Sequence, residues 1–389
     1  MYPNLFYAFK DLFGVEWPFL RYVNSFGFFV ALAFIAAAIV LTRELKRKSS
    51  QSLLQYTEME IMVGRPATTI ELGLNFLLGF LLGYKILALF IMDNAATEDP
   101  QAFIFSTIGS WPAGIGLGLL FAGIKWWEKN KQKLAKPEKR KIRIWPHDRV
   151  GEITIIALIF GLVGAKIFNA FETWDSFIQD PMGSLFSAEG LTFYGGLICA
   201  ALAIWWYARK YKIGFWHLND AAAPALMLAY GIGRIGCQVS GDGDWGIVNK
   251  LKKPISWLPD WMWSYTYPHN VAREGVEIAG ETDKYRFVLP EGVFPTPLYE
   301  IVACIILFFV LWYFRKKLKT PGTLFALYLM LNGLERFFIE KIRVNTRLDI
   351  FGFKPTQAEV ISTLLFITGA ALWVYLRNRN KSKTKLPSN

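Results

Sequence analysis

Long apolar blocks constrain the fold of this chain more than any other feature of its sequence. The run Phe26–Leu41 reads FGFFVALAFIAAAIVL, and blocks of the same character recur along the 389 residues. Segments of about 20 apolar residues match the hydrocarbon thickness of a bilayer, whereas helices in a soluble core are usually shorter. A content of 53% hydrophobic and 16% aromatic residues agrees with this interpretation. The sequence therefore predicts an all-α polytopic membrane protein.

The apolar blocks predict about nine transmembrane helices, and the charges between them predict a direction for each. The predicted ranges are 23–42, 71–93, 113–127, 152–172, 192–208, 217–238, 298–314, 321–341 and 357–376. Basic runs follow every second span, and two of the opposite connections are acidic. Because Lys and Arg gather in cytoplasmic loops, we expect an outside N-terminus and a cytoplasmic C-terminus. The outer connection 242–296 is rich in Trp, Tyr and Pro, which predicts a small folded cap.

The net charge and the cysteines exclude some classes of function. The charge of +12 and the run Lys136–Arg143 invite a nucleic-acid interpretation, but cytoplasmic loops of a membrane protein explain both better. Cys199, Cys237 and Cys304 lie in or beside apolar segments, and they form neither a disulfide framework nor a metal-ligand spacing. We expect neither a nucleic-acid partner nor a metal.

An internal repeat indicates that part of the chain is duplicated. An offset of 81 residues aligns segment 71–130 with segment 152–211. The matched pairs include Glu71/Glu152, Gly83/Gly164, Lys85/Lys166, Asp99/Asp180 and Gly114/Gly195. We therefore predict an extra helical hairpin within a single integral membrane domain, residues 1–389. The paired lysines fit either a transport path or a structural role in each copy.

The stretch Ala229–Gly246 (AYGIGRIGCQVSGDGDWG) contains a G-x-G-x-x-G pattern formed by Gly231, Gly233 and Gly236. As a dinucleotide fingerprint this pattern requires a preceding strand and a βαβ unit, and here it closes a predicted membrane helix. The dinucleotide interpretation therefore fails. In a membrane helix, such glycines permit close helix packing or let a ligand approach the backbone.

Two arginines are predicted at the same outer level, on different helices. Arg234 lies near the outer end of the sixth span, and Arg336 lies near the end of the eighth, on one helix face with Glu340. An arginine within a span marks a functional site by default, although Arg234 could snorkel and Arg336 could simply pair with Glu340. Two guanidinium groups at the headgroup level suit a phosphate, which they bind with paired donors.

These motifs, together with FYGGL, FPTPLYE and LERFFIE, occur in an order and spacing that resembles the prolipoprotein diacylglyceryl transferase family. The resemblance implies transfer of the diacylglyceryl group of phosphatidylglycerol to the lipobox cysteine of a prolipoprotein signal peptide. The products are a thioether and glycerol-1-phosphate. It further implies a multi-pass protein of the bacterial inner membrane, a periplasmic cap, lipid as a partner and no cofactor.

The resemblance also assigns the candidate site residues. It implies catalytic roles for Tyr194, Arg234, Arg336 and Glu340. The residues that it implies for the phosphatidylglycerol headgroup are Arg234, Gly233, Gly236, Gly246, Arg336, Asp242 and Glu300.

Several of these positions depart from the family pattern. Most members have a histidine where this chain has Tyr194, and a neutral tyrosine is a poor base for a thiol. Tyr194 acts either as a tyrosinate favoured by arginines or as a hydrogen-bonding group, unless it is only an interfacial belt residue. Cys237 replaces a usual asparagine, and Asp242 and Asp244 flank one additional residue. Phe26 and Asn332 stand where the family commonly has tyrosines.

Two other classes of function remain as alternatives. A lipid or anion transporter would use the paired lysines and the repeat, but transporter sites usually lie at the midplane, whereas the polar residues here gather at one face. An inactive homologue that binds lipid would explain the missing histidine, but both arginines and Glu340 are retained.

Overall fold

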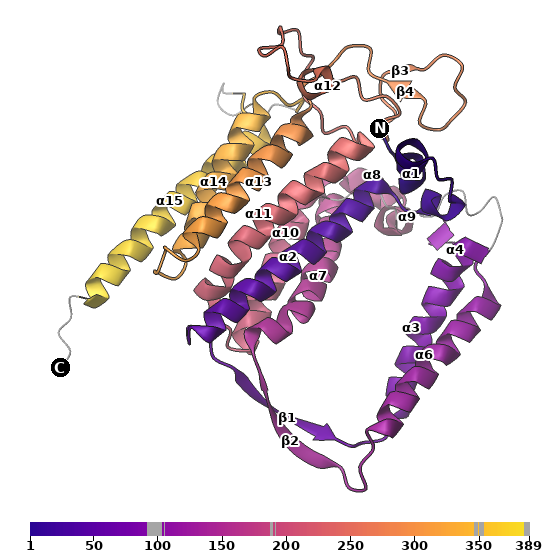
Figure 1. Ribbon diagram of the computed structural model, residues 1–389, viewed down its shortest axis with the longest axis vertical. Coiled ribbons are helices and arrows are strands. Elements are labelled where there is room, and N and C mark those ends of the chain that lie inside the picture. Colours follow the sequence, from indigo (N-terminus) through magenta and orange to yellow (C-terminus); the bar gives the residue numbers. More distant parts are fainter. Residues whose placement is uncertain are drawn as a thin grey trace. The chain divides into compact units, whose positions relative to one another are not determined.

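The computed structural model describes residues 1–91, 103–104, 106–186, 190, 192–345, 349 and 354–384, and it is mainly helical (Figure 1). Each of the nine predicted spans is helical within the described residues. Five described helices are long and apolar enough to cross a membrane: Ser25–Ser50, Thr69–Ile91, Pro146–Glu172, Thr296–Phe314 and Gln357–Asn380. The prediction of an all-α polytopic membrane protein is confirmed.

The chain divides into two compact units. Unit 1 comprises Met1–Gln55, Pro146–Thr154 and Ala208–Asn389, and unit 2 comprises Tyr56–Trp145 and Ile155–Tyr207. The elements within unit 1 are α1 (Leu5–Phe13), η1 (Pro18–Tyr22), α2 (Ser25–Ser50), η4 (Pro146–Arg149), α11 (Phe215–Ser240), α12 (Asp260–Trp263), β3 (Val276–Glu277), β4 (Phe287–Val288), α13 (Thr296–Phe314), α14 (Thr323–Glu340) and α15 (Gln357–Thr384).

Unit 2 contains two helical hairpins and one small sheet. Its elements are β1 (Thr57–Val63), α3 (Thr69–Leu81), the π-helical η2 (Leu82–Leu87), α4 (Ala88–Ile91), α6 (Trp111–Lys131), β2 (Glu138–Ile144), α8 (Trp174–Gln179) and α9 (Pro181–Phe186). The helices α7 (Val150–Glu172) and α10 (Phe193–Lys210) lie mostly in this unit, and one end of each belongs to unit 1.

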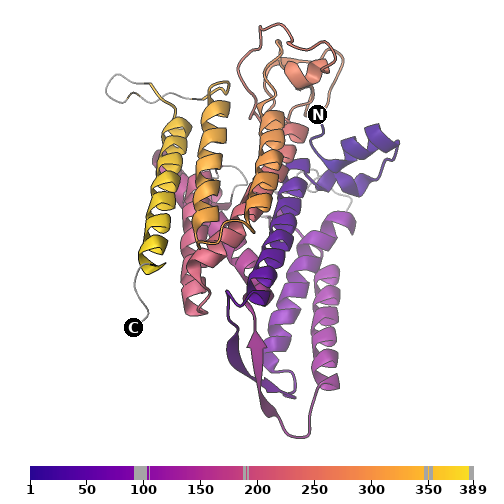
Figure 2. The same cartoon turned by 60° about the vertical axis from the view of Figure 1, so that its left-hand side comes forward.

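Small residues place α11 at the centre of the helices of unit 1. Helices α2 and α13 both pack on it (Figures 1 and 2). A Cβ atom at Gly231 would lie 3.0 Å from Cys304 Cβ of α13, and one at Gly236 would lie 3.2 Å from the Phe26 carbonyl oxygen of α2. The helices can approach this closely because glycine has no side chain, as is common where membrane helices pack together. Two of the three motif glycines therefore serve helix packing.

The start of α14 is held by a side chain of α11. The N-cap residue Gly322 has no side chain with which to satisfy the first N–H groups of the helix. Instead, the carboxylate of Asp220 accepts hydrogen bonds from the N–H groups of Gly322 at 2.8 Å and Phe325 at 3.0 Å. This contact fixes where α14 begins relative to α11.

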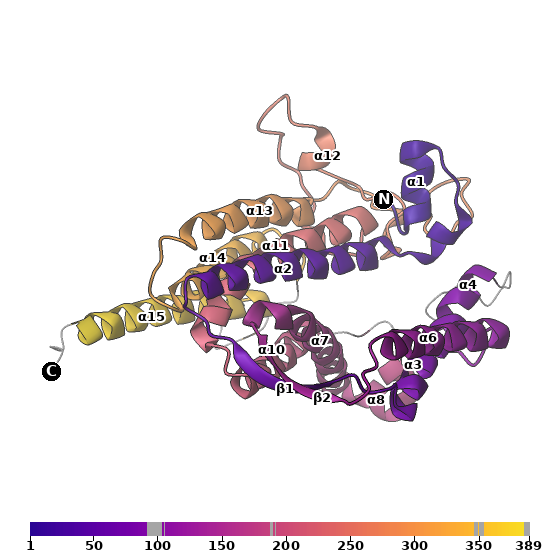
Figure 3. The same ribbon diagram turned by 60° about the horizontal axis from the view of Figure 1, so that its bottom comes forward.

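The predicted cap is a folded segment between α11 and α13, and it contains α12 and the β3–β4 pair (Figures 1 and 3). Its core is built from the buried residues Trp245, Tyr267 and Val293. The hydroxyl of Tyr267 donates to Gln238 Oε1 at 2.9 Å, which ties this core to the end of α11. A buried polar pair of this kind fixes the cap to the helix that carries Arg234.

Equivalent positions of the two hairpins make equivalent contacts. A Cβ atom at Gly83 would overlap α6 at Ala113, and one at Gly164 would lie 2.6 Å from the Gly195 carbonyl oxygen of α10. The ammonium of Lys85 donates to the Phe103 carbonyl oxygen at 2.9 Å, and that of Lys166 donates to the Ser184 carbonyl oxygen at 3.3 Å, 81 residues further on. The duplication stays a prediction that these contacts support, and they favour the structural role of the lysines.

The structure differs from the prediction at the ends of spans and in one connection. Helices α2 and α15 run on through basic residues to Ser50 and Thr384, because Arg, Lys and Glu are good helix formers. The basic stretch before α7 forms β2, which pairs antiparallel with β1. Acidic side chains of β1 face basic ones of β2, as the 3.8 Å pair of Lys141 and Glu60 illustrates. The acidic connection 93–100 lies outside the described residues.

Candidate active site

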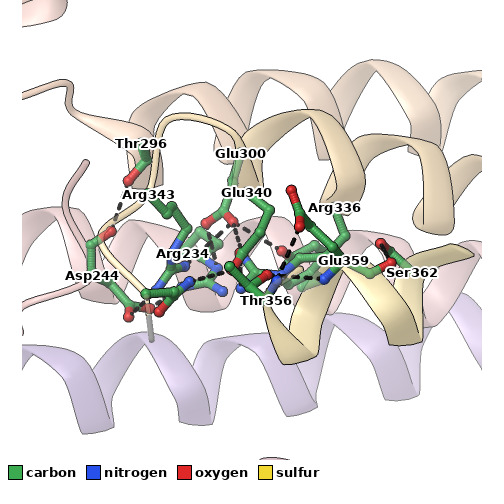
Figure 4. A network of polar contacts seen from close by, with 12 residues as sticks. Arg234, Asp244, Thr296, Glu300, Arg336, Glu340, Arg343, Thr356, Glu359 and Ser362 are labelled. Atoms are coloured by element: carbon green, nitrogen blue, oxygen red, sulfur yellow. Dashed lines mark hydrogen bonds and ion pairs between the residues drawn. The ribbon is translucent and has the colours of Figure 1, made fainter. Parts of the chain in front are cut away.

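Polar side chains from three helices of unit 1 meet on one carboxylate. Glu300, in the first turns of α13, has a side chain that is 0% exposed. Arg234 of α11 places Nε 2.7 Å from its Oε2, and Arg336 of α14 donates from Nη1 to Oε1 at 3.0 Å (Figure 4). The hydroxyl of Tyr230 also donates to Oε1, at 3.2 Å. The predicted approach of Arg234 and Arg336 to one level is therefore seen as a shared partner.

Glu340 holds Arg336 from the same helix. The Nη2 atom of Arg336 lies 2.9 Å from Glu340 Oε2, in the predicted i,i+4 arrangement. The other oxygen of Glu340 accepts from Asn345 Nδ2 at 2.6 Å. Glu300 and Glu340 contact the Arg336 guanidinium from two different helices, so these contacts fix the orientation of its plane.

A third arginine joins the group beyond the end of α14. Arg343 is only 8% exposed, and its Nη2 donates to Asp244 Oδ1 at 2.5 Å. The other oxygen of Asp244 accepts from Arg234 Nη1. Asp244 lies in the loop that follows α11, so one loop carboxylate bridges arginines from two segments. Neither Arg343 nor Asp244 has a role that the sequence alone predicted.

Gly246 explains how Arg343 reaches this position. Its N–H donates to the Phe294 carbonyl oxygen at 2.8 Å, and the next N–H, of Ile247, donates to the Ile342 carbonyl oxygen at 2.8 Å. A Cβ atom at Gly246 would overlap the Ile342 carbonyl oxygen and lie 2.9 Å from Phe294 Cβ. Only glycine allows this close approach of two backbones, which sets Arg343 beside Asp244.

We call Arg234, Arg336, Arg343, Asp244, Glu300 and Glu340 the arginine cluster. Its three guanidinium groups balance its three carboxylates, so its formal charge is zero with every group ionised. Burial would raise the pKa of Asp244, but the charges of Arg234 and Arg343 outweigh burial and hold that pKa below the usual range. Asp244 therefore stays ionised in the neutral pH range.

The arginine cluster retains unused hydrogen-bonding capacity. Among the described residues, Arg343 Nε and Nη1 are buried without a hydrogen-bond partner, and Nη1 has a long ion pair to Glu300 Oε1 at 3.7 Å. Both carboxylate oxygens of Glu335, which is 8% exposed and precedes Arg336, also lack one. Buried polar groups are usually satisfied, so such exceptions indicate a place where a ligand or water completes the network. Glu335 was not among the residues predicted from the sequence, although its position beside Arg336 was a signal.

Asp242 contacts the backbone of its own loop, and its role in headgroup binding stays a prediction. Its Oδ1 accepts the N–H of Asp244 at 3.3 Å, so it shapes the loop. Burial, and then the charge of Asp244, raise the pKa of Asp242 above its usual value. Of the motif glycines, Gly236 contacts α2, whereas a Cβ atom at Gly233 would meet only open space. A ligand can therefore approach the backbone of α11 at Gly233.

Tyr194 lies in unit 2, near the start of α10, and its ring contacts Phe193 edge-on with centroids 5.6 Å apart. It belongs to the second hairpin of the predicted repeat. Its role stays a prediction.

Cys237, Asp242 and Asp244 are close enough to hold a cation, since their ligand atoms lie within 4.8 Å of one another. However, both oxygens of Asp244 already accept hydrogen bonds from arginines. Two guanidinium groups beside the position repel a cation and favour an anion. The arrangement therefore suits an anionic ligand better than a metal.

The fold and the arginine cluster together define a class: a multi-pass membrane protein that presents several arginines at one end of a helix bundle. Comparisons with known proteins agree. The family described as prolipoprotein diacylglyceryl transferase matches residues 113–375. A phosphatidylglycerol–prolipoprotein diacylglyceryl transferase of Dehalococcoides mccartyi is 30% identical over 294 residues, which cover 74% of this chain and 97% of the relative.

Two more distant relatives carry the same name. The protein of Leptospira interrogans is 29% identical over 54% of this chain and 66% of its own length, and that of Pseudoalteromonas atlantica is 26% identical over 63% and 80%. The chain belongs to the prolipoprotein diacylglyceryl transferase family. It is an enzyme of this class, a diacylglyceryl transferase.

Proposed function

We propose that this chain transfers the diacylglyceryl group of phosphatidylglycerol to the thiol of a lipobox cysteine in a prolipoprotein signal peptide. The names of its relatives supply phosphatidylglycerol and prolipoprotein as substrates. The observation that carries the proposal is the convergence of Arg234, Arg336 and Arg343 from separate segments onto shared carboxylates. Several guanidinium groups with unused donors suit the phosphate of a lipid headgroup.

The reaction explains why positive charge is needed at this place. The thiol sulfur bonds to the headgroup-bearing carbon of the diacylglycerol, the bond from that carbon to a phosphate oxygen breaks, and the thiol gives up its proton. Glycerol-1-phosphate leaves with the electron pair of the broken bond, so negative charge grows on the phosphate in the transition state. Prearranged guanidinium groups stabilise charge that develops in this way.

Arg234 and Arg336 hold the leaving phosphate in this mechanism, and Glu300 and Glu340 orient them. Gly233 lets the headgroup approach α11, Gly236 keeps that helix packed on α2, and Gly246 positions Arg343. The role of Asp242 is to shape the loop that presents Asp244.

Tyr194 is the candidate residue that acts on the substrate thiol, because it stands where most family members have a histidine. It acts either by a hydrogen bond from its hydroxyl or as a tyrosinate that accepts the proton. Replacement by phenylalanine tests both forms, because phenylalanine keeps the ring and removes the hydroxyl.

The same proposal includes a bacterial inner membrane, with the N-terminus and the cap in the periplasm and the C-terminus in the cytoplasm. The alternation of basic connections supports this orientation. Labelling of single introduced cysteines with an impermeant reagent in intact cells tests it. Reaction at position 280 in the cap but not at position 381 is expected, and the reverse pattern contradicts it.

The decisive experiment incubates the purified chain with phosphatidylglycerol and a peptide that carries a lipobox cysteine. Mass spectrometry of the peptide is expected to show a diacylglyceryl adduct with the wild type and little or none with Arg234→Ala. The matched control is Arg286→Ala, which removes a partly exposed cap arginine paired with Glu277 and should leave the adduct unchanged. A well-folded wild type that forms no adduct contradicts the proposal.

A further inference from the structure

The Asp244 carboxylate lies between two guanidinium groups, at a position that suits an anion. Its Oδ1 accepts from Arg343 Nη2 at 2.5 Å, and its Oδ2 accepts from Arg234 Nη1. Carboxylates and phosphates present pairs of oxygens to guanidinium in the same manner. The position that Asp244 fills is therefore one in which a phosphate would make the same two contacts (Figure 4).

Of the three carboxylates in the arginine cluster, that of Asp244 is the one that can most easily turn away from the arginines. The Asp244 side chain is 34% exposed, whereas the side chains of Glu300 and Glu340 are 0% exposed, and both of these residues lie on helices. Asp244 lies in a loop, next to Gly243 with φ of 97°. Its backbone is held in place, because the Thr296 hydroxyl donates to the Asp244 carbonyl oxygen at 2.7 Å. The side chain can turn outward while the loop stays fixed.

The charge balance of the cluster requires such a departure. Three arginines already face three carboxylates, so a phosphodiester added to the intact cluster would leave an uncompensated negative charge in a largely buried site. Uncompensated buried charges are costly. Exchange of the Asp244 carboxylate for the phosphate keeps the charge constant, and the freed carboxylate reaches water.

We propose that Asp244 occupies the phosphate position of the empty enzyme, leaves it when a phosphate group binds and returns as the phosphate product departs. This inference rests on the proposed function for the identity of the lipid phosphate. It assigns to Asp244 a positioning role: the residue competes with the substrate headgroup and speeds release of glycerol-1-phosphate. When no lipid is bound, the Asp244 carboxylate keeps the buried Arg234 and Arg343 paired.

Binding of glycerol-1-phosphate to the purified full chain, measured by isothermal titration calorimetry, tests the exchange without any turnover. We expect Asp244→Asn to bind this anion about tenfold more tightly than the wild type, because a charged competitor becomes neutral. Asp244→Ser, which also lacks the charge, should behave alike, so the test does not depend on one variant's folding. Glu277→Gln, in the cap and outside the cluster, should match the wild type.

Turnover then gives a second readout. With phosphatidylglycerol in mixed micelles, Asp244→Asn should show a lower KM and a lower kcat, because the lipid binds more readily and the product leaves more slowly. A residue that merely organises the arginines would raise KM. Weaker or unchanged binding of glycerol-1-phosphate by both folded variants overturns the inference.

The two proposals fail in distinguishable ways. Tighter anion binding by the variants together with no adduct from the wild type would contradict the proposed function and leave the exchange intact. Adduct from the wild type without tighter binding by the variants would contradict the exchange alone.

Discussion

Unit 1 buries charged groups at both ends of its helices, and the two groups differ in how completely they are satisfied. At the end opposite the arginine cluster lie Glu44, Arg47, Lys48, Asp220 and Arg315, which we call the opposite-end cluster. Glu44 is 1% exposed and contacts Arg47 at 2.8 Å and Arg315 at 2.5 Å. It joins the end of α2 to the end of α13.

The partners of the opposite-end cluster all belong to helices or helix ends. Glu44 pairs within α2 and across to Arg315, and Asp220 caps the first turn of α14. The arginine cluster instead includes a third arginine, a loop carboxylate that is 34% exposed, and Arg343 Nε, which is buried without a hydrogen bond. Arg315 Nε of the opposite-end cluster also lacks a hydrogen bond, but it lies 2.5 Å from Glu44 Oε1. The comparison teaches that burial of charge does not itself mark a site. A partly exposed loop carboxylate and a buried guanidinium nitrogen without a hydrogen bond distinguish the candidate active site from the opposite-end cluster.

The largest expected effect separates the two ends by activity. Arg336→Ala should lower kcat/KM by about 10²–10³, the usual result of removing a group that stabilises transition-state charge. Arg315→Ala is the matched change in the opposite-end cluster and should leave kcat/KM of the folded enzyme within about threefold. Adduct formation with lipobox peptide measures both. Equal losses in the two variants would break the comparison.

The second expected effect separates them by stability. Glu44→Ala leaves two arginines facing each other without a carboxylate, and loss of one partner of a buried ion pair costs about 3–5 kcal/mol. We expect a clear fall in unfolding temperature in detergent, with the specific activity of the surviving folded protein preserved. An unfolding temperature equal to that of the wild type would show that the opposite-end cluster does not stabilise the bundle.

A smaller effect is expected at Gly246. Replacement by alanine pushes the loop away from Ile342 and so displaces Arg343, while Arg234 and Arg336 keep their helices. Misplacement of a group by about 1 Å can cost up to about 10²-fold in rate, and a peripheral member should cost about tenfold. The expected signature is weaker binding of glycerol-1-phosphate with a small change in unfolding temperature. Unchanged binding would remove Arg343 from the anion site.

The smallest expected effect concerns the pH dependence of stability near the arginine cluster. Burial raises the pKa of Asp242 in the folded state, so protonation favours folding. The contribution of Asp242 to stability is fullest below its unfolded pKa of about 3.9 and is lost as pH rises through the raised folded-state pKa. Asp242→Asn should remove this decline and be slightly more stable than the wild type at neutral pH. Unfolding temperatures measured across the acidic range test this, and parallel curves for both proteins contradict it.

The local part of this architecture could be predicted from the sequence. Hydrophobic length located the nine helices, and helix periodicity placed Arg336 and Glu340 as an i,i+4 pair. The direction of each span brought Arg234 and Arg336 to one level, where they share Glu300. These inferences needed only the chain within each helix and the alternation of the spans.

The remaining part depends on contacts between distant loops. Arg343 and Asp244 are 99 residues apart in sequence, and they meet because Gly246 lets two backbones approach. No periodicity reports such a contact. The opposite-end cluster could not be predicted for the same reason. The run RELKRK (residues 43–48) indicates a cytoplasmic connection, but it does not show that Glu44 pairs with Arg315. The β1–β2 pair likewise forms between segments on either side of a hairpin.

The contact of Asp220 with Gly322 has a consequence for how this enzyme can vary in length. Arg234 follows Asp220 by 14 residues in α11, and Arg336 follows Gly322 by 14 residues in α14. At about 1.5 Å per residue, both arginines stand about 21 Å from a common origin. The Asp220–Gly322 contact therefore sets a common starting point from which each helix carries its arginine over the same length. An insertion of one residue between Asp220 and Arg234, or between Gly322 and Arg336, would shift that arginine by about 1.5 Å along its helix and turn it by about 100°. Loops elsewhere are free to lengthen.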